Sequence, residues 1–157
     1  MIPLLKTLLF TVAVPGTVTV ALPWWILQRS GSPPVTPPGA PGAVPIGIGA
    51  AIYLWCAWDF AVTGRGTPAP IDPPKELVLR GMYRHVRNPM YVAVLLVLFG
   101  EAWLFRAPAL LGYAAAVWGV FQAFVLWYEE PALERQFGDA YRRYRQEVPR
   151  WIPRVGR

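Results

Sequence analysis

Four long apolar stretches dominate the chain, and short polar connections separate them. They run from Ile2 to Leu27, from Ala43 to Thr63, from Pro89 to Phe105 and from Ala107 to Tyr128. A helix needs about 20 mostly apolar residues to cross the hydrocarbon core of a bilayer. The pattern therefore predicts an all-α integral membrane bundle of four transmembrane helices. The first stretch is too long for the apolar part of a signal peptide and lacks an A-x-A cleavage site, so we expect it to be retained.

The connections differ in character. The segment from Gln28 to Gly42 is rich in proline and nearly uncharged, which favours a stiff, extended loop without catalytic groups. Between the third and fourth stretches only Arg106 and the following Pro108 interrupt the apolar run. These two stretches should therefore form a tight helical hairpin.

The C-terminal segment has the period of an amphipathic helix. Its apolar face is expected to consist of Leu133, Phe137, Tyr141, Tyr144 and Val148, which recur every three or four residues. Pro131 suits a first helical turn and disfavours helical geometry at Glu130. We expect the fourth span to break at Glu129 and Glu130, with one surface helix after the break. The chain would then be a single membrane domain over 1–157: two spans (1–63), a loop (64–88), a hairpin (89–128) and an amphipathic tail (129–157).

The composition agrees with a membrane protein and narrows the chemistry. Of the 157 residues 55% are hydrophobic and only 15% are charged, whereas soluble domains carry about a quarter. The single cysteine and the single histidine exclude a disulfide framework and a metal site built on clustered Cys or His, so we expect no metal.

Charge predicts an orientation. All but Arg29 and Arg106 of the 15 Lys and Arg residues lie at the N-terminus, in the 64–88 loop or in the tail. By the positive-inside rule both termini, this loop and the tail are expected in the cytoplasm, with the protein in a bacterial inner membrane. In so apolar a chain, the net charge of +6 points to anionic headgroups as partners and not to nucleic acid.

Polar residues that can carry chemistry gather at two places on the predicted cytoplasmic rim. One is the loop that ends in Arg84, His85, Arg87 and Asn88, and the other is the pair Glu129 and Glu130. Taken alone, arginines beside a membrane helix are usually headgroup anchors, and two glutamates are usually a solvated helix end. The hairpin topology, however, brings both groups to the same rim, where we expect Arg87, Asn88 and the glutamates to face one another.

An ordered set of short motifs runs through this region. It comprises Gly81-Met82-Tyr83, Arg87-Asn88-Pro89-Met90-Tyr91, Glu129-Glu130-Pro131-Ala132-Leu133, Phe137-Gly138-(x2)-Tyr141-(x2)-Tyr144 and Val148-Pro149-Arg150-Trp151-Ile152-Pro153. Over Leu77 to Pro153 the chain resembles the isoprenylcysteine carboxyl methyltransferase family, particularly its small bacterial members. The resemblance implies a methyltransferase that binds S-adenosylmethionine on the cytoplasmic side and takes a lipid-linked acceptor from the bilayer.

The resemblance also implies a set of site residues. Those expected at the cofactor are Leu79, Gly81, Tyr83, His85, Arg87, Asn88, Pro89, Tyr91, Glu129 and Glu130. Arg87 can pair with the carboxylate of the cofactor or with an acceptor anion, and the glutamates can accept from its ammonium or ribose hydroxyls. The catalytic residues are expected to be Arg87, His85 and Glu130.

The acceptor stays open at this stage. A carboxylate needs no general base, as in isoprenylcysteine O-methylation, whereas in phospholipid-type N-methylation His85 or a glutamate would have to take a proton from the amine. Asn88 stands where many family members have histidine, and Glu147 stands where eukaryotic members tend to have a basic residue. Both differences are compatible with a lipid acceptor other than a prenylcysteine.

Two other functions compete with methyl transfer. An NADPH-dependent membrane reductase has a broadly comparable helical end, and a non-enzymatic module would use the basic tail to bind anionic lipid. Two acidic residues have simpler explanations: Asp59 is expected to pair with Arg65 or a loop arginine, and Glu101 to reach the interface at the outer end of its span.

Overall fold

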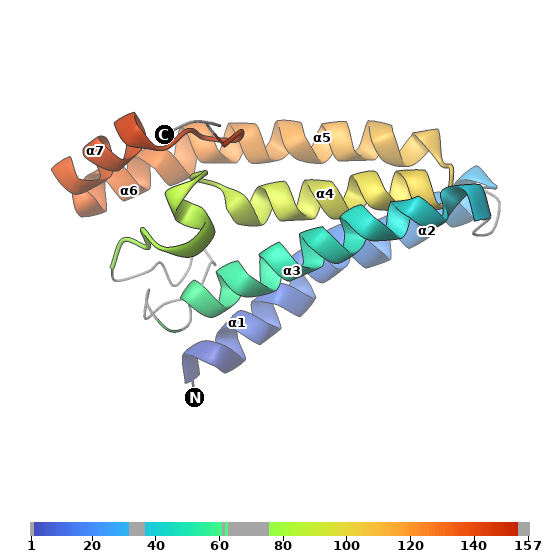
Figure 1. Ribbon diagram of the computed structural model, residues 1–157, viewed down its shortest axis with the longest axis horizontal. Helices are drawn as coiled ribbons and strands as arrows, with labels where there is room; N and C mark the ends of the chain where they lie inside the picture. The colour runs from blue at the N-terminus through green and yellow to red at the C-terminus, as the bar shows by residue number, and fades with distance from the viewer. Residues whose placement is uncertain (1, 32–36, 61, 63–75, 154–157) are drawn as a thin grey trace.

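The computed structural model describes residues 2–31, 37–60, 62 and 76–153, and every regular element in them is helical (Figure 1). The α-helices are α1 (Ile2–Ala13), α2 (Leu22–Ser30), α3 (Ala43–Asp59), α4 (Pro89–Leu104), α5 (Pro108–Phe124), α6 (Glu130–Phe137) and α7 (Asp139–Glu147). Two π-helical turns, η1 (Thr17–Ala21) and η5 (Val125–Glu129), lie between α-helices, and two short 3-10 helices are η2 (Pro37–Gly42) and η4 (Gly81–Arg84). The all-α prediction is confirmed.

The described part of the chain contains three helices that are long and apolar enough to cross a membrane, namely Leu8–Ser30, Ala40–Asp59 and Pro108–Phe137. The third predicted span, from Pro89 to Phe105, is the shorter apolar helix α4. With 16 residues it is about 24 Å long, less than a bilayer core of about 30 Å. It lies between α3 and α5 in Figure 1 and buries residues along its whole length, including Met90, Val94 and Leu98. The short helix is thus the centre of the bundle.

The backbones of α3 and α4 approach closely through glycines. A Cβ atom at Gly49 would lie 2.6 Å from the carbonyl oxygen of Ala93, and one at Gly100 would lie 2.7 Å from that of Gly42. Small residues allow such contact between membrane helices. The proline-rich connection was predicted to be extended, but its described end, Pro37–Gly42, is the 3-10 helix η2. This helix packs on α4, where Gly42 meets the backbone of Gly100.

Helix starts follow the prolines. Asn88 has a non-helical backbone and α4 begins at Pro89, while Ala107 is extended and α5 begins at Pro108. Arg106, with a φ of 49°, makes the turn between them. The tight hairpin predicted from the sequence is confirmed.

The predicted break at Glu129 and Glu130 is wrong. Both residues have helical backbone angles, and the helix continues through η5 into α6, so one rod runs from Pro108 to Phe137. A proline inside an α-helix lacks the N–H and clashes with the carbonyl four residues earlier. Here that carbonyl belongs to Trp127, which lies in the wider π-helical turn, and the helix tolerates Pro131. The first predicted span also has a π-helical turn just before a proline, because η1 ends two residues before Pro23.

The tail is two helices and not the single helix predicted. Gly138, with φ 52° and ψ −125°, separates α6 from α7. A left-handed φ of this kind favours glycine. The predicted apolar face is nevertheless correct, because Tyr141, Tyr144 and Val148 form a buried cluster against which Leu133 and Phe137 pack.

Candidate active site

The loop before α4 is anchored to the inner end of α3. Asp59 is buried with 2% of its surface exposed, and its Oδ1 lies 3.3 Å from Nε of Arg80. Gly81 has a φ of 58° and sits so close to Asp59 that a Cβ atom would collide with Oδ2 of that carboxylate. The expected partner of Asp59 is thus a loop arginine, whereas Arg65 lies outside the described residues. This anchor fixes the 3-10 helix η4, which positions Tyr83.

The tail fixes the other side of the same loop. The hydroxyl of Tyr144 donates to the backbone carbonyl of Tyr83 at 2.7 Å, and the backbone N–H of Arg87 donates to the carbonyl of Pro149 at 2.9 Å. Nδ2 of Asn88 donates to the carbonyl of Arg150 at 3.2 Å. Burial raises the pKa of the Tyr83 phenol well above its usual value and that of Tyr144 above its usual value. Both phenols therefore remain neutral hydrogen-bonding groups.

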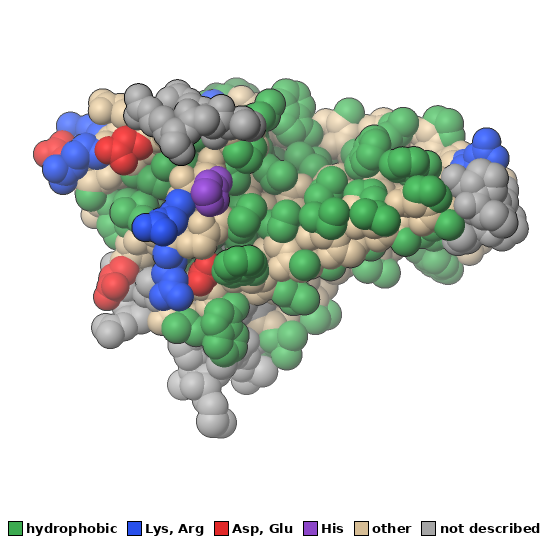
Figure 2. Space-filling model, viewed as in Figure 1, with side chains coloured by type: hydrophobic (Ala, Val, Ile, Leu, Met, Phe, Trp, Pro, Cys, Tyr) green, Lys and Arg blue, Asp and Glu red, His purple; other side chains and the backbone are tan. Residues whose placement is uncertain are grey.

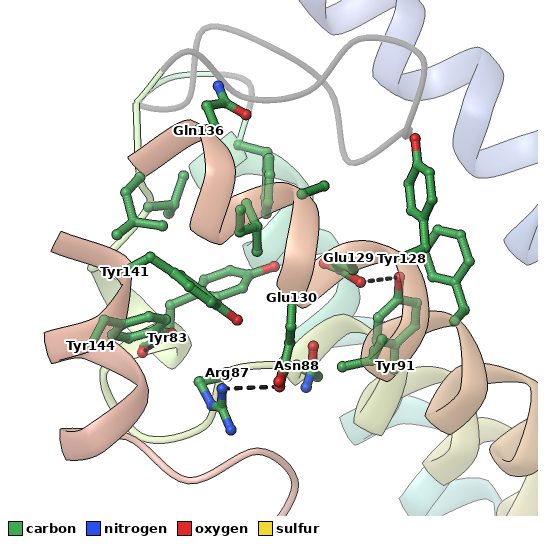
Figure 3. A pocket seen from close by; sticks show the side chains of 17 residues that line it. Tyr83, Arg87, Asn88, Tyr91, Tyr128, Glu129, Glu130, Gln136, Tyr141 and Tyr144 are labelled. Carbon is green, nitrogen blue, oxygen red and sulfur yellow. Dashed lines mark hydrogen bonds and ion pairs between the residues drawn. The ribbon is translucent and has the colours of Figure 1, made fainter. Parts of the chain in front are cut away.

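Glu130 lies between two arginines. Nε and Nη2 of Arg150 donate to its two carboxylate oxygens at 2.8 and 3.0 Å, and Nη1 of Arg87 lies 3.0 Å from Oε1 (Figure 3). The side chains of Arg87 and Glu130 are only 9% and 8% exposed. The hydrogen bonds to Glu130 are the largest cause that raises the pKa of Arg150 above its usual value. These three residues, which we call the arginine clamp, join α4's start, α6 and the C-terminal segment.

The clamp carries one positive charge in excess. Two guanidinium groups face one carboxylate, and Nε and Nη1 of Arg87 are buried without an aligned hydrogen-bond partner among the described residues. Buried polar groups normally have partners. Nε of Arg87, which lies outside the ion pair with Glu130, is therefore suited to an anionic group of a ligand.

The second glutamate has a different partner. The hydroxyl of Tyr91 in α4 donates to Oε2 of Glu129 at 2.8 Å, and Figure 3 shows this pair beside Arg87 and Glu130. The ring of Tyr91 packs on Phe121, with ring centroids 4.6 Å apart. Glu129 and Glu130, although adjacent in sequence, thus face different groups.

Two cavities meet at these residues. The first, of about 160 Å³, is the more polar of the two: apolar side chains such as Leu133 share its lining with both glutamates, Gln136 and the phenols of Tyr141 and Tyr144. The second, of about 360 Å³, extends between α1, α3, α4 and α5 and is lined mainly by apolar side chains such as Val18, Val94 and Phe121. Their common wall consists of Phe60, Tyr83, Arg87, Asn88, Tyr91, Phe124 and Glu129.

The structure brings together six of the predicted site residues at the first cavity: Tyr83, Arg87, Asn88, Tyr91, Glu129 and Glu130. Four others do not line either cavity. Leu79 and His85 are exposed, and the histidine is visible at the surface in Figure 2. Pro89 is buried at the start of α4, and Gly81 contacts Asp59. Arg87 and Glu130 face each other as the sequence predicts, whereas His85 lies at the surface, away from both cavities.

Sequence reasoning did not select Arg150, Gln136 or Trp151. The indole of Trp151 donates to Oε1 of Gln122 at 2.7 Å and holds the C-terminal segment on α5. Arg150 and Trp151 belong to the motif from Val148 to Pro153. The presence of this motif among those that carry the family resemblance was the sequence feature that could have identified them. No group of His, Cys, Asp or Glu suited to a metal ion occurs in the described part of the chain.

Comparison with known proteins identifies the kind of protein that carries this site. A sequence model of the phospholipid methyltransferase family matches residues 39–140, which include α3, α4, α5 and both glutamates. An uncharacterized protein of Haemophilus influenzae is 42% identical over 64 residues, which are 40% of this chain and the whole of that protein. The family match favours methyl transfer over the reductase and the non-enzymatic module. The chain belongs to the phospholipid methyltransferase family and is a membrane methyltransferase that uses S-adenosylmethionine.

Proposed function

We propose that the first cavity binds S-adenosylmethionine, that the second receives the apolar chain of a lipid acceptor, and that a carboxylate of this acceptor is methylated at their common wall. The observation that carries the proposal is the direct contact, through one shared set of residues, between a cavity lined by both glutamates and a larger, more apolar cavity. A reaction between a polar cofactor and a membrane lipid needs two such compartments, because each ligand must be desolvated by a surface of matching polarity.

The residues of the first cavity fit the cofactor. Nε of Arg87, which is buried without an aligned hydrogen-bond partner among the described residues, suits its carboxylate, and Glu129 suits its ammonium or ribose hydroxyls. The rings of Tyr83 and Tyr91 can face adenine or the sulfonium cation. When bound, S-adenosylmethionine would supply a methyl group on a cationic sulfur: the acceptor oxygen or nitrogen forms a bond to the methyl carbon, and the sulfur leaves on the opposite side as a neutral thioether.

The residues of the common wall hold the acceptor in place. Asn88 offers an amide donor to an anionic head, while the apolar lining of the second cavity excludes water from it. A carboxylate is ionised at neutral pH, so no side chain has to remove a proton. Correct placement of two reactants can supply effective molarities of about 10⁵ M or more. Positioning and exclusion of water are therefore the protein's main contributions.

One observation favours an amine as a second candidate acceptor. Glu129 is a carboxylate on the common wall, held by Tyr91, and it is placed to take a proton that an amine must lose. His85 does not line either cavity, so the base in phospholipid N-methylation would be Glu129 and not the histidine.

The two acceptors can be separated with purified protein in lipid nanodiscs and methyl-labelled S-adenosylmethionine. One sample receives N-acetyl-S-farnesylcysteine, a lipid thioether with a carboxylate, and the other phosphatidylethanolamine. A methyl ester releases its label as methanol in base, whereas a methylated amine does not. Arg87→Ala should abolish labelling, while Arg142→Ala is the matched control, because this exposed arginine pairs only with Glu134 and Asp139 among the described acids. Base-stable product would move the assignment to N-methylation, and no product from either acceptor would refute both candidates.

We also propose that both ends of this integral membrane protein face the cytoplasm. The charge asymmetry of the sequence supports this orientation. In a Cys56→Ala background, an impermeant thiol reagent applied to intact cells should label Ser30→Cys and leave Gly156→Cys unlabelled. The reverse pattern would invert the topology.

A further inference from the structure

A third cavity adjoins the second one and is open at the surface of the bundle, where Val12, Val20 and Leu54 of its lining are exposed. It has a volume of about 640 Å³ and lies between the α1–η1 region, α3 and α4. Among the described residues, only Pro15, Tyr53 and Val94 line both the second and the third cavity. These three residues, which we call the partition, separate two spaces that are otherwise both apolar.

The cavities follow one another along α4, away from Arg87. The second cavity reaches Met90, Tyr91 and Val94, and the third reaches Ala93, Val94 and Val97. The partition at Val94 is six residues beyond Asn88, or about 9 Å along the helix. An alkyl chain whose head lies at Asn88 therefore meets the partition after filling the second cavity.

Tyr53 is the largest residue of the partition and is held in place. Only 8% of its surface is exposed, and it belongs to the same buried cluster as Cys56 and Val94. Its hydroxyl lies 3.2 Å from Oγ1 of Thr11, a bond that joins α3 to α1 across the boundary. Both ends of this side chain are thus fixed, the ring by packing and the hydroxyl by Thr11.

We propose that Tyr53 is the specificity-determining residue that limits the length of the acceptor chain. The inference rests on the proposed function, because it assumes that the second cavity holds this chain. A chain that ends before Tyr53 is fully buried in the second cavity, and a longer chain has to bend or withdraw. Removal of the ring joins the second and third cavities and lets longer chains extend toward Val97.

The test is a series of N-acetyl-S-alkylcysteines, from hexyl to eicosyl, assayed for kcat/KM. For the wild type, kcat/KM should rise about fourfold for each added methylene until the chain meets the partition, and then stop rising. Tyr53→Ala should continue to rise over several further methylenes. Tyr53→Phe keeps the ring and should retain the wild-type limit.

Two further variants control for damage to the fold. Leu54→Ala alters the next residue of α3, which lines the third cavity only, and should leave the limit unchanged. Val18→Phe adds bulk to the second cavity alone and should shorten the preferred chain. Affinity for S-adenosylmethionine, measured by calorimetry, should stay within about twofold in all variants, because none of these residues lines the first cavity. An identical chain-length profile in Tyr53→Ala and wild type, with normal cofactor affinity, would overturn the inference.

Failure of the proposed function gives a different result. If the wild type methylates no member of the series, the carboxylate acceptor is wrong, and chain placement is then read from crosslinking of the same thioethers with a diazirine at the alkyl end. In the wild type the hexadecyl probe should label residues of the second cavity, such as Val18. In Tyr53→Ala the label should move to Ala50 and Val97. An excess of the same thioether without the diazirine should suppress the labelling. Labelling of Ala50 in the wild type would contradict the partition.

Discussion

The arginine clamp makes a quantitative prediction about coupling between the tail and the membrane helices. In Glu130→Gln, both Arg87 and Arg150 lose their anionic partner, and Arg87 is almost fully buried. Removal of one partner from a buried ion pair costs about 3–5 kcal/mol. Arg150→Ala should cost less, about 1.5–3 kcal/mol, because Arg150 is 28% exposed and Glu130 keeps Arg87.

The double variant decides whether the clamp acts as a unit. With Glu130 already replaced, removal of Arg150 also removes one of two uncompensated cations, so the double variant should be no less stable than Glu130→Gln. The expected coupling energy is about 1.5–3 kcal/mol, which corresponds to roughly 10- to 150-fold in an equilibrium constant.

Stability is measured by reversible unfolding in detergent, and the affinity for S-adenosylmethionine by calorimetry. Both quantities should show the coupling, because the clamp also holds Arg87 at the first cavity. Arg142→Ala serves as the control, since its bonds to Glu134 and Asp139 are exposed and should contribute less than about 1 kcal/mol. Losses that simply add in the double variant would refute the reasoning.

Three further predictions concern single side chains. Tyr91→Phe removes the 2.8 Å hydrogen bond to Glu129 and should lower kcat/KM about tenfold or more, since a hydrogen bond to a charged group contributes about 1.5–3 kcal/mol; unchanged kinetics would remove Tyr91 from the site. His85→Gln should keep at least half of the activity and leave the pH profile unaltered, because the exposed ring does not line either cavity; a loss of 10²-fold or more would show that it acts as a base. Gly81→Ala should lower the unfolding temperature and weaken cofactor binding, because the new methyl group collides with Asp59 and the φ of 58° is unfavourable for alanine. Gly119→Ala, where the methyl group meets open space, should do neither, and equal effects of the two variants would exclude the anchor at Asp59.

Local sequence signals predicted the parts of the fold that depend on them. Pro89 and Pro108 mark helix starts because a proline restricts the preceding residue, and this restriction acts whatever the tertiary structure. The spacing of Tyr141 and Tyr144 identified the buried face of the tail because burial on one side of a helix imposes its period. From the hairpin alone it followed that Arg87 and Glu130 would face each other.

Other features depend on contacts that no local pattern encodes. Arg150 lies beyond the last helix, where the chain has no period, and only its return across α4 and α6 brings it to Glu130. His85 follows a 3-10 helix whose orientation is fixed from outside the loop by Asp59 and Tyr144, so its outward direction could not be read from neighbouring arginines. The sequence also did not predict that the helix continues through Pro131. The expectation that a proline breaks a helix assumes α-helical spacing in the preceding turn, and here that turn is π-helical.

The π-helical turn at Val125–Glu129 lies inside the rod, between α5 and α6, and takes up one extra residue there. Such a turn holds one residue more than an α-helix of the same rise, and one residue corresponds to about 100° of rotation. Deletion of a single residue from this turn would let the rod close into a regular α-helix of about the same rise and leave Glu130 directed toward Arg87, whereas deletion of a residue from the regular part of α5 would rotate Glu130 by about 100°. A change in chain length, with no change in the chemistry of any site residue, would thus be enough to separate the two halves of the clamp.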